Sequence, residues 1–445
     1  MRYRPQYHFT ASHGWINDPN GLVYYKGHYH LFFQHNPDSL VWDKMHWGHA
    51  ISEDLVHWTE LPIALYPDEC YENDDRGGCF SGSAVIVGDR LFLFYTASSG
   101  GYQSQCIAYT DDGFNFHKYD NNPVIMPHSG IHDSRDPFIF KRGNKYDILL
   151  GFDGHIELYE ADDLRYWSDK GTFFSFDKST GTIAECPSIF EEDGKSYLSF
   201  SPISYGTEGH NVLFVEGNIE NSIFCEQRRF AADYGPDYYA LQTFADKRGK
   251  RVGIAWANGW QWMRDFKGFG PTEEEGWRGF LTFPRIFYVK DGHLCSYPVP
   301  EAEACYKELV IDEEITAGKM AVSLSDTDSF HLSLLLDPFS GDIPPMEIGI
   351  YKDKIRSLCM VVDYRSLRVF LYENSAKGEI ERIFSAPILQ GPLSIDIFAD
   401  RASTEIYFNK GFSSFSINAY RQDGFSGPWL RALSGEVRVK TKLFC

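Results

Sequence analysis

The sequence predicts an all-β protein, and three observations support this fold class. Aromatic residues make up 16% of the 445 residues, and flat rings and β-branched side chains suit a pleated sheet. Short runs of such residues are separated by turn signals, as in residues 21–27, 29–33 and 91–95. Helical periodicity does not persist beyond about two turns, so strands are favoured throughout the chain.

A repeated segment predicts how the first strands are organised. Residues 51–58, 109–116 and 159–167 each read as a strand, an acidic turn and a second strand that opens on an aromatic residue. The copies lie roughly 50 to 60 residues apart, the spacing of four-stranded propeller blades. At that period about five blades fit before residue 290, so we expect a five-bladed β-propeller. Unrelated hairpins with the same turn chemistry are the alternative.

The pattern changes near residues 298–301, Pro-Val-Pro-Glu. A short, helix-permissive stretch covers residues 301–310, and alternating strands such as residues 330–334 and 393–398 follow. Turn signals about every ten residues there predict a β-sandwich. The expected domains are a propeller at 1–298, a linker at 299–310 and a C-terminal β-sandwich at 311–445.

The charge balance limits the partners. The chain has 42 Lys and Arg against 62 Asp and Glu, which gives a formal net charge of −20. Such a polyanion repels phosphate backbones and anionic lipid, so neither nucleic acid nor a membrane is expected as a partner. A neutral small molecule fits better, and a homo-oligomer stays open.

Cysteine and histidine usage indicates neither a metal site nor a disulfide framework. The nine cysteines show no CxxC pairs, and we expect no bridge between Cys70 and Cys79 because no apolar leader segment points to an oxidising compartment. We therefore expect a cytoplasmic protein. His46 and His49 are three residues apart but lack an organised carboxylate or thiolate partner, so no metal or other cofactor is expected.

Three acidic residues stand beside prolines: Asp18 in Trp-Ile-Asn-Asp-Pro-Asn-Gly, Asp136 in Ser-Arg-Asp-Pro, and Glu185 in Ala-Glu-Cys-Pro. Proline cannot donate to a sheet ladder and holds the preceding residue extended, so each motif marks a strand end. Each motif alone is typical of an ordinary turn. In a propeller, however, three such strand ends from different blades can direct their carboxyl groups into one pocket.

Glycoside hydrolysis requires such a group of carboxyls. A retaining enzyme uses an ionised carboxylate as nucleophile and a protonated carboxyl as general acid. Neighbouring like charges raise the pKa of one carboxyl, and hydrogen bonds or a guanidinium keep another ionised. Arg135 is the candidate guanidinium, which leaves Glu185 as the expected proton donor and Asp18 as the nucleophile. The carboxyls are expected to titrate as a coupled set.

The chain resembles glycoside hydrolase family 32, the invertase, fructan-hydrolase and sucrose-6-phosphate hydrolase group. The similarity follows the sequence order across most of the chain and is carried by these motifs: residues 8–10, 14–21, 29–37, 47–50, 79–83, 135–137, 185–187, 237–244, 276–279 and 398–407. Ile16 stands where the family usually has Met. Residues 295–298, Cys-Ser-Tyr-Pro, stand where many members have Gln-x-Pro, and residues 301–390 show little similarity.

The resemblance implies a five-bladed propeller with a C-terminal sandwich and a β-fructofuranosidase activity. It implies Asp18 as nucleophile, Glu185 as acid/base and Asp136 as transition-state stabiliser. By the same motif matching, the fructose subsite is expected to be lined by Asn17, Gln34, Trp42, Phe80, Ser81, Arg135, Tyr239 and Trp256.

Other functions stay open. A fructosyltransferase would pass the same covalent intermediate to a sugar, a fructan-binding module would use the scaffold without catalysis, and an arabinan-type hydrolase is disfavoured by the residues around Asp18. Within the hydrolases, sucrose 6-phosphate or a fructan chain can replace sucrose as the substrate. A phosphate would require a basic clamp, which the sequence does not reveal.

Overall fold

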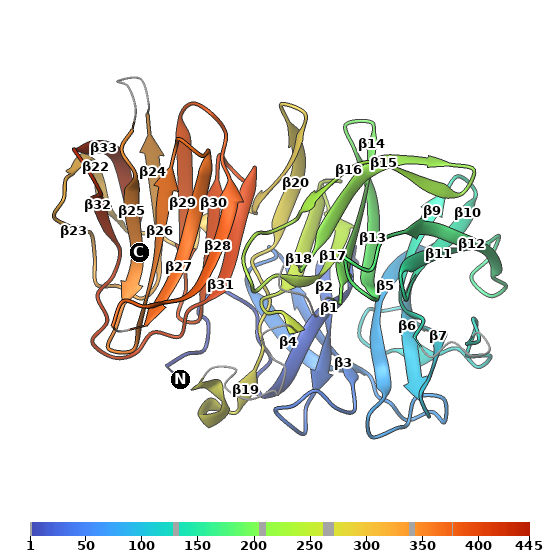
Figure 1. Ribbon diagram of the computed structural model, residues 1–445. Helices are drawn as coiled ribbons and strands as arrows, with labels where there is room; N and C mark the ends of the chain where they lie inside the picture. Colours follow the sequence, from blue (N-terminus) through green and yellow to red (C-terminus); the bar gives the residue numbers. More distant parts are fainter. Residues whose placement is uncertain (1, 128–132, 204–210, 261–270, 338–342, 376) are drawn as a thin grey trace. The chain divides into compact units, whose positions relative to one another are not determined.

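The computed structural model describes residues 2–127, 133–203, 211–260, 271–337, 343–375 and 377–445 (Figure 1). Strands dominate, and the described helices are a 3₁₀ turn, η2 (Pro271–Glu275), and one turn of α-helix, α1 (Pro300–Glu303). The chain forms two compact units. The large unit comprises Phe9–Ala232 and Tyr238–Phe287, and the small unit comprises Met1–His8, Asp233–Asp237 and Tyr288–Cys445.

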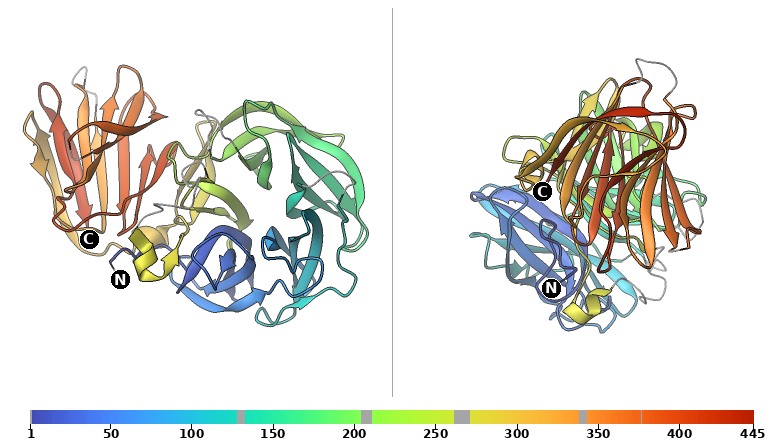
Figure 2. Two further views of the ribbon diagram at one scale, coloured as in Figure 1. Left: turned by 60° about the horizontal axis from the view of Figure 1, so that its bottom comes forward. Right: turned by 90° about the vertical axis from the view of Figure 1, so that its left-hand side faces the viewer.

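Up to residue 298 the strands form five sheets, each made mainly of consecutive strands. The sheets have the strand orders β19-β1-β2-β3-β4, β5-β6-β7-β8, β12-β11-β10-β9, β13-β14-β15-β16 and β17-β18-β20-β21. From β1 to β20 the sheets succeed one another in chain order, from blue to yellow (Figure 2). Their bounds are β1 Gly14–Tyr25, β2 His28–Asn36, β3 His46–Ser52, β4 Trp58–Leu65, β5 Gly78–Val87, β6 Arg90–Ser99, β7 Tyr102–Thr110, β8 His117–Lys118, β9 Arg135–Arg142, β10 Lys145–Phe152, β11 His155–Ala161, β12 Ser168–Ser175, β13 Ala184–Glu192, β14 Lys195–Pro202, β15 Leu213–Glu220, β16 Ile223–Ala231, β17 Tyr239–Ala245, β18 Arg251–Trp256, β19 Trp277–Arg278, β20 Arg285–Lys290 and β21 His293–Pro298.

The repeat predicted from the sequence is confirmed as the turn between the third and fourth strands of a sheet. Asp54, Asp112 and Asp163 each accept two backbone N–H groups, from the residues two and three positions further on, at 2.8–3.2 Å. This local bonding lets an aspartate hold a tight turn. The acidic residue of each copy is therefore a structural residue.

A short strand late in the large unit returns to the first strand. β19 pairs parallel with β1, with Gly14 opposite Trp277 and Trp15 opposite Arg278. Gly279 follows with φ +88°, and a Cβ there would lie 2.0 Å from the carbonyl oxygen of Ile16, so only glycine fits. This pairing covers an edge of the first sheet, which would otherwise present unpaired backbone groups.

Apolar side chains fill the space between neighbouring sheets. One cluster joins the first and second sheets, for example Trp47 with Leu93. A second joins the second and third sheets, for example Phe94 with Ile148, and another joins the third and fourth. Rigid packing between sheets fixes the strand ends, where the acidic motifs lie.

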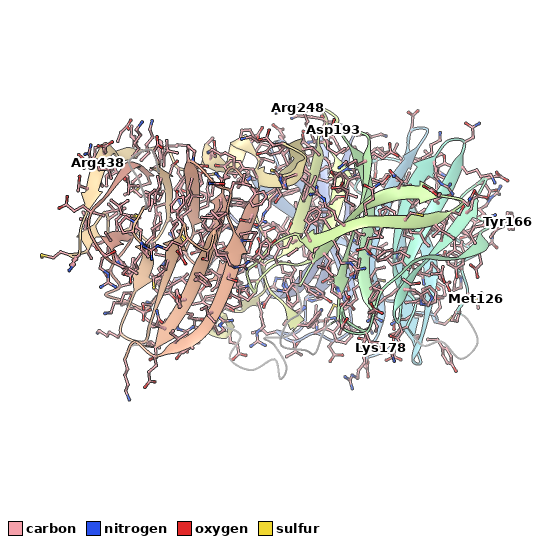
Figure 3. All side chains as sticks on the ribbon, turned by 45° about the horizontal axis from the view of Figure 1, so that its top comes forward. Met126, Tyr166, Lys178, Asp193, Arg248 and Arg438 are labelled. Atoms are coloured by element: carbon pink, nitrogen blue, oxygen red, sulfur yellow. The ribbon has the colours of Figure 1, made fainter. Side chains whose placement is uncertain are left out.

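The first strand of each sheet carries an irregularity at the motif. In β9, Arg135 is opposite Gly151 and Phe138 is opposite Leu149, so one extra residue stands on β9. Register shifts occur at the corresponding place in β1, β5, β13 and β17. Such β-bulges redirect side chains and are common beside active sites. At their other ends β13 and β17 run into turns that hold Asp193 and Arg248, both near the top of the view in Figure 3.

The small unit holds two six-stranded sheets, β22-β33-β24-β29-β30-β31 and β23-β32-β25-β26-β27-β28, which enclose one apolar core. The helix-permissive stretch 301–310 is mostly not helical, because α1 ends at Glu303 and a strand already begins at Leu309. The bounds are β22 Leu309–Ala317, β23 Val322–Ser323, β24 Phe330–Leu336, β25 Met346–Lys352, β26 Arg356–Asp363, β27 Arg368–Ser375, β28 Ile380–Pro387, β29 Leu393–Ala399, β30 Ser403–Phe408, β31 Ser413–Asn418, β32 Trp429–Ala432 and β33 Val437–Phe444.

A buried ion cluster ties the N-terminal segment into the small unit. His8 Nδ1 lies 3.0 Å from Asp400 Oδ2, and His8 Nε2 lies 3.0 Å from Glu405 Oε1. The backbone N–H groups of Gln6 and Tyr7 also donate to Asp400. All three ionisable side chains are fully buried.

Candidate active site

Asp18 lies on β1 and is held by three neighbours. The Ser81 hydroxyl donates to Oδ2 at 2.7 Å, and the Asn17 amide donates to Oδ1 at 2.9 Å. The thiol of Cys186 lies 3.7 Å from Oδ2. Asn17 is itself fixed, because its Oδ1 accepts from the indole N–H of Trp15 at 2.7 Å. The carboxyl of Asp18 is therefore oriented from two sides and is 9% exposed.

Asp136 lies on β9 and shares Cys186 with Asp18. The backbone N–H of Cys186 donates to Asp136 Oδ2 at 2.9 Å, and the Cys186 thiol lies 3.5 Å from the same oxygen. The backbone N–H of Asp136 donates to Thr96 at 3.0 Å. One cysteine on β13 thus lies against both aspartates.

Glu185 precedes Cys186 and accepts hydrogen bonds on both carboxyl oxygens. Arg135 Nε donates to Oε1 at 2.9 Å, and the Tyr239 hydroxyl donates to Oε2 at 2.6 Å. Burial and the charge of Glu185 raise the pKa of Tyr239 well above its usual range, so the phenol keeps its proton and donates. Arg135 also pairs with Asp133 at 2.5 Å.

The same backbone conformation recurs at this place on three sheets. Arg135, Glu185 and Tyr239 are each followed by a residue with positive φ. These residues are Asp136, Cys186 and Ala240, with φ of +64°, +49° and +55°. Residues other than glycine rarely adopt this left-handed conformation, and it costs about 1–3 kcal/mol where it occurs. The bulges explain it: each extra residue turns the backbone so that Arg135, Glu185 and Tyr239 form one hydrogen-bonded row.

The two aspartates have raised pKa values. Burial, followed by the charge of Glu185, raises the pKa of Asp18 to about 6, against the hydrogen bonds from Ser81 and Asn17. Burial and Glu185 likewise raise the pKa of Asp136 to about 7, against the guanidinium of Arg135. Carboxyls that share a site in this way exchange protons near neutral pH, as acid–base chemistry requires.

Of the other predicted residues, Gln34 is buried on β2, and its amide donates to the carbonyl of Cys79 at 2.9 Å. Trp42 and Phe80 are partly exposed and have ring centroids 5.6 Å apart. Trp256 is fully buried, 5.9 Å from Trp15 between ring centroids. Four of the predicted residues donate hydrogen bonds directly to the acidic residues, namely Asn17, Ser81, Arg135 and Tyr239. Among the described side chains, Gln34, Trp42, Phe80 and Trp256 form no hydrogen bond with those acidic residues.

Three residues contribute to the site that the sequence did not single out. Asp133 pairs with Arg135, and Thr96 accepts the N–H of Asp136. Asp133 stands two residues before Arg135, just ahead of β9, and this short spacing could have suggested the first. The third is Cys186, whose thiol and N–H contact the aspartates. Burial and the neighbouring carboxylates raise the pKa of this thiol well above its usual range, so it stays protonated.

The histidines that could have suggested a metal site are used in packing. His30 Nδ1 lies 3.0 Å from His49 Nε2, and His46 bonds the carbonyl of Lys44. Burial lowers the pKa of His49 to about 3, which keeps it neutral. Within the described part of the chain, no group of three or more His, Cys, Asp or Glu could hold a metal ion. None of the nine cysteines forms a disulfide. No described helix has the length and apolar character to cross a membrane.

Comparison with known proteins gives a consistent result. The family model for the glycosyl hydrolases family 32 N-terminal domain matches residues 8–298. A sucrose-6-phosphate hydrolase of Escherichia coli is 31% identical, over 94% of this chain and 90% of that protein. A levanase of Bacillus subtilis is 31% identical over 99% of this chain and 69% of that protein.

Solved structures agree with the sequence relatives. A β-fructofuranosidase of Bombyx mori superposes with a TM-score of 0.84 at 27% identity, covering 100% of this chain and 94% of the other. An exo-inulinase of Aspergillus awamori superposes with a TM-score of 0.86 at 25% identity, covering 100% and 98%. The acidic residues of β1, β9 and β13, the matched family model and these relatives lead to one conclusion: the chain belongs to glycoside hydrolase family 32.

Proposed function

We propose that the protein is a retaining β-fructofuranosidase. It hydrolyses terminal β-D-fructofuranosyl residues of sucrose or short fructo-oligosaccharides through a covalent fructosyl-enzyme. The observation that carries this proposal is how Asp18, Asp136 and Glu185 are grouped. Cys186, which follows Glu185 in the chain, contacts both aspartates, and Arg135, which precedes Asp136, donates to Glu185. Family membership supports the same reaction class.

In the first step, an oxygen of ionised Asp18 attacks the anomeric carbon of the fructosyl unit. The bond from that carbon to the leaving oxygen breaks, and Glu185 gives its proton to that oxygen. In the second step Glu185 takes a proton from water, the water oxygen bonds to the anomeric carbon, and Asp18 leaves as a carboxylate. Ser81 and Asn17 hold Asp18 in place for both displacements.

The proton that Glu185 donates must reach it when substrate binds. In the free protein both Glu185 oxygens accept hydrogen bonds, whereas the pKa of Asp136, raised to about 7, leaves this carboxyl partly protonated near neutral pH. We propose that fructose hydroxyls donate to Asp136 and stabilise its charge, so that the shared proton moves to Glu185. This gives Asp136 its role as transition-state stabiliser. Asn17, Gln34, Trp42, Phe80, Ser81, Arg135, Tyr239 and Trp256 remain the proposed fructose subsite.

We also propose that the five sheets are the blades of a five-bladed propeller. The proposed domain limits are 1–298 for the propeller, 299–310 for the linker and 311–445 for the sandwich. The strand order supports them, because the fifth sheet ends at Pro298 and the next strand begins at Leu309. The cytoplasmic location and a homo-oligomer stay predictions.

The stereochemistry of the first product tests the mechanism. If Asp18 is a nucleophile, two displacements occur and sucrose first releases β-fructofuranose. In the Asp18→Ala variant, added azide should restore part of the rate and give the opposite anomer. NMR of the anomers in the first moments of cleavage measures this, and initial α-fructofuranose from the unmutated protein would contradict the nucleophile assignment.

The identity of the substrate needs a separate experiment. Relatives named sucrose-6-phosphate hydrolase and levanase favour two alternatives, a phosphorylated disaccharide and a fructan chain. The experiment is a side-by-side measurement of kcat/KM on sucrose, sucrose 6-phosphate, 1-kestose, inulin and levan. Sucrose and 1-kestose should be cut best. A dominant rate on sucrose 6-phosphate or levan would change the proposed substrate but leave the proposed mechanism intact.

A further inference from the structure

The outer face of the second small-unit sheet carries an indole that is not part of the core. On β32, Leu430 and Ala432 point into the apolar core. Because side chains alternate along a strand, Trp429 and Arg431 lie on the opposite face. Trp429 is partly exposed, and it is the last of the ten tryptophans in the chain, all others standing before residue 280.

The Trp429 ring lies flat against the neighbouring strand. Gly349 on β25 is directly opposite Trp429, and a Cβ at Gly349 would come within 1.9 Å of Cε2 and 2.0 Å of Cδ2 of the indole. These two atoms are shared by both rings, so an atom close to both must lie over the ring face. One face of the indole therefore covers Gly349, and the other face points away from the sheet.

Two neighbours fix the ring in this orientation. Glu347 Oε1 accepts the indole N–H at 2.9 Å, and Glu347 Oε2 pairs with Arg431. Glu347 thus satisfies the one polar group of the indole and neutralises the adjacent guanidinium. The outward ring face is an apolar plate of fixed position.

A pocket of about 480 Å³ lies over this plate. That volume falls in the range of about 300–1,000 Å³ that small-ligand sites have. Its wall carries short, neutral hydrogen-bonding groups on neighbouring strands, among them Ser357 on β26 and Asn374 on β27, with Lys352 at the end of β25. The Asn374 amide donates to the sulfur of Cys359, a weak acceptor, at 3.6 Å.

We propose that this surface is a second, non-catalytic carbohydrate site on the sandwich. A sugar ring has an apolar C–H face and an edge of hydroxyls. The C–H face would cover the outward face of Trp429, and the hydroxyls would exchange hydrogen bonds with Ser357, Asn374 and Lys352. An anionic ligand fits less well, because Glu347 already pairs with Arg431.

The chemistry of the plate and wall selects a neutral oligosaccharide. The inference that the units of this oligosaccharide are fructosyl rests on the proposed function, since a second site of the same specificity would keep a substrate chain bound to the protein. Binding would be weak, with a Kd on the order of millimolar, as expected for one stacked ring and a few exposed hydrogen bonds.

The test uses the full chain with 5-fluorotryptophan in place of tryptophan and the Asp18→Asn variant to prevent turnover. The ¹⁹F resonance that disappears in Trp429→Phe belongs to Trp429. Titration with 1-kestose should shift this resonance to saturation. Ser357→Ala or Asn374→Ala should weaken that binding about five-fold, whereas Ser333→Ala on the other sheet should not change it.

The outcomes separate this inference from the proposed function. With Asp18 intact, the wall variants should keep the kcat/KM of the unmutated protein on sucrose. The 1-kestose concentration that saturates the other tryptophan resonances sets the scale. If the Trp429 resonance does not move at 50-fold that concentration, the sandwich site is overturned and the proposed function is unaffected. A resonance that moves with maltotriose but not with 1-kestose would overturn its fructosyl specificity. If no sucrose is hydrolysed yet Trp429 responds to 1-kestose, the proposed function fails and the site stands.

Discussion

Asp136 in the large unit and Asp400 in the small unit are both fully buried, yet their pKa values move in opposite directions. That of Asp136 is raised to about 7, whereas that of Asp400 is lowered to about 2. Burial disfavours the charged form of both carboxyls. The difference must therefore come from the groups that face each one.

The donors around the two carboxyls differ in number and charge. Asp400 accepts the ring N–H of His8 and the backbone N–H groups of Gln6, Tyr7 and Arg401. Asp136 accepts the N–H of Cys186, contacts its thiol and faces Glu185 as a like charge. A carboxylate with several donors is stable when buried, and one beside another carboxylate is not.

The comparison separates a stabilising cluster from a reactive one. At Asp400 the charges are compensated, so the cluster fastens residues 6–8 to the small unit. At Asp136 they are left partly uncompensated, and the site can bind or release a proton near neutral pH. Natural proteins tolerate such an unfavourable arrangement where function requires it.

The largest effect is expected from Asp18→Ala, which removes the proposed nucleophile. Turnover of sucrose should fall by about 10⁴-fold or more. The control is Asp54→Asn, which alters an aspartate of a turn in the same sheet and should leave kcat within about two-fold. If Asp18→Ala retained more than a tenth of the activity as a folded protein, the reactive cluster would lie elsewhere.

Glu185→Gln should have the next largest effect, a loss of about 10²–10⁴-fold, because it removes the general acid. In the unmutated protein, activity should rise with pH through about 6 as Asp18 ionises and fall again at higher pH as the acid is lost. The variant should keep the rising limb and lose the falling one. An unchanged falling limb in pH–rate profiles would exclude Glu185 as the acid.

Much of this site could be predicted from the sequence. Asp18, Asp136 and Glu185 stand in short motifs beside proline, and the repeat of acidic turns placed them on different sheets. The Asp54, Asp112 and Asp163 turns repeat because a local hydrogen-bond pattern fixes them, and local patterns are visible in a sequence.

What escaped prediction depends on contacts between distant strands. The thiol of Cys186 meets Asp18, 168 positions away, only because bulges turn both strand ends inward. His8 and Asp400 are 392 positions apart, and neither neighbourhood reveals the other. The predicted helix-permissive stretch 301–310 proved mostly irregular or extended, because weak local propensity yields to tertiary packing.

The stabilising cluster is tested by His8→Ala, which should lower the free energy of unfolding by about 3 kcal/mol, since it leaves Asp400 and Glu405 buried without their cation. Activity of the folded protein should not change. The matched control is His57→Ala, which removes an exposed imidazole 2.7 Å from Asp54 and should cost at most about 1 kcal/mol.

The pH dependence of this cluster has a defined sign. The pKa of His8 is raised from 6.5 to about 9, so its contribution to stability is complete below pH 6.5 and is lost as pH rises through about 9. Thermal unfolding from pH 6 to 10 should show this loss in the unmutated protein. The same slope in His8→Ala would assign it to other groups.

The smallest effect on the free energy of unfolding is expected from Asp136→Asn. This variant should raise stability, whereas His8→Ala should lower it. The pKa of Asp136 is raised from 3.8 to about 7, so its contribution to stability is complete below pH 3.8 and is lost as pH rises through about 7. An asparagine can still accept the N–H of Cys186 but never ionises. The variant should therefore match the unmutated protein at pH 4 and exceed its stability at pH 8. Denaturant unfolding at both pH values measures this difference, with Asp400→Asn as the counterpart that should destabilise at pH 8. Equal stability of Asp136→Asn and the unmutated protein at pH 8 would mean that the buried carboxylate is compensated as fully as Asp400, and the contrast between the two clusters would fail.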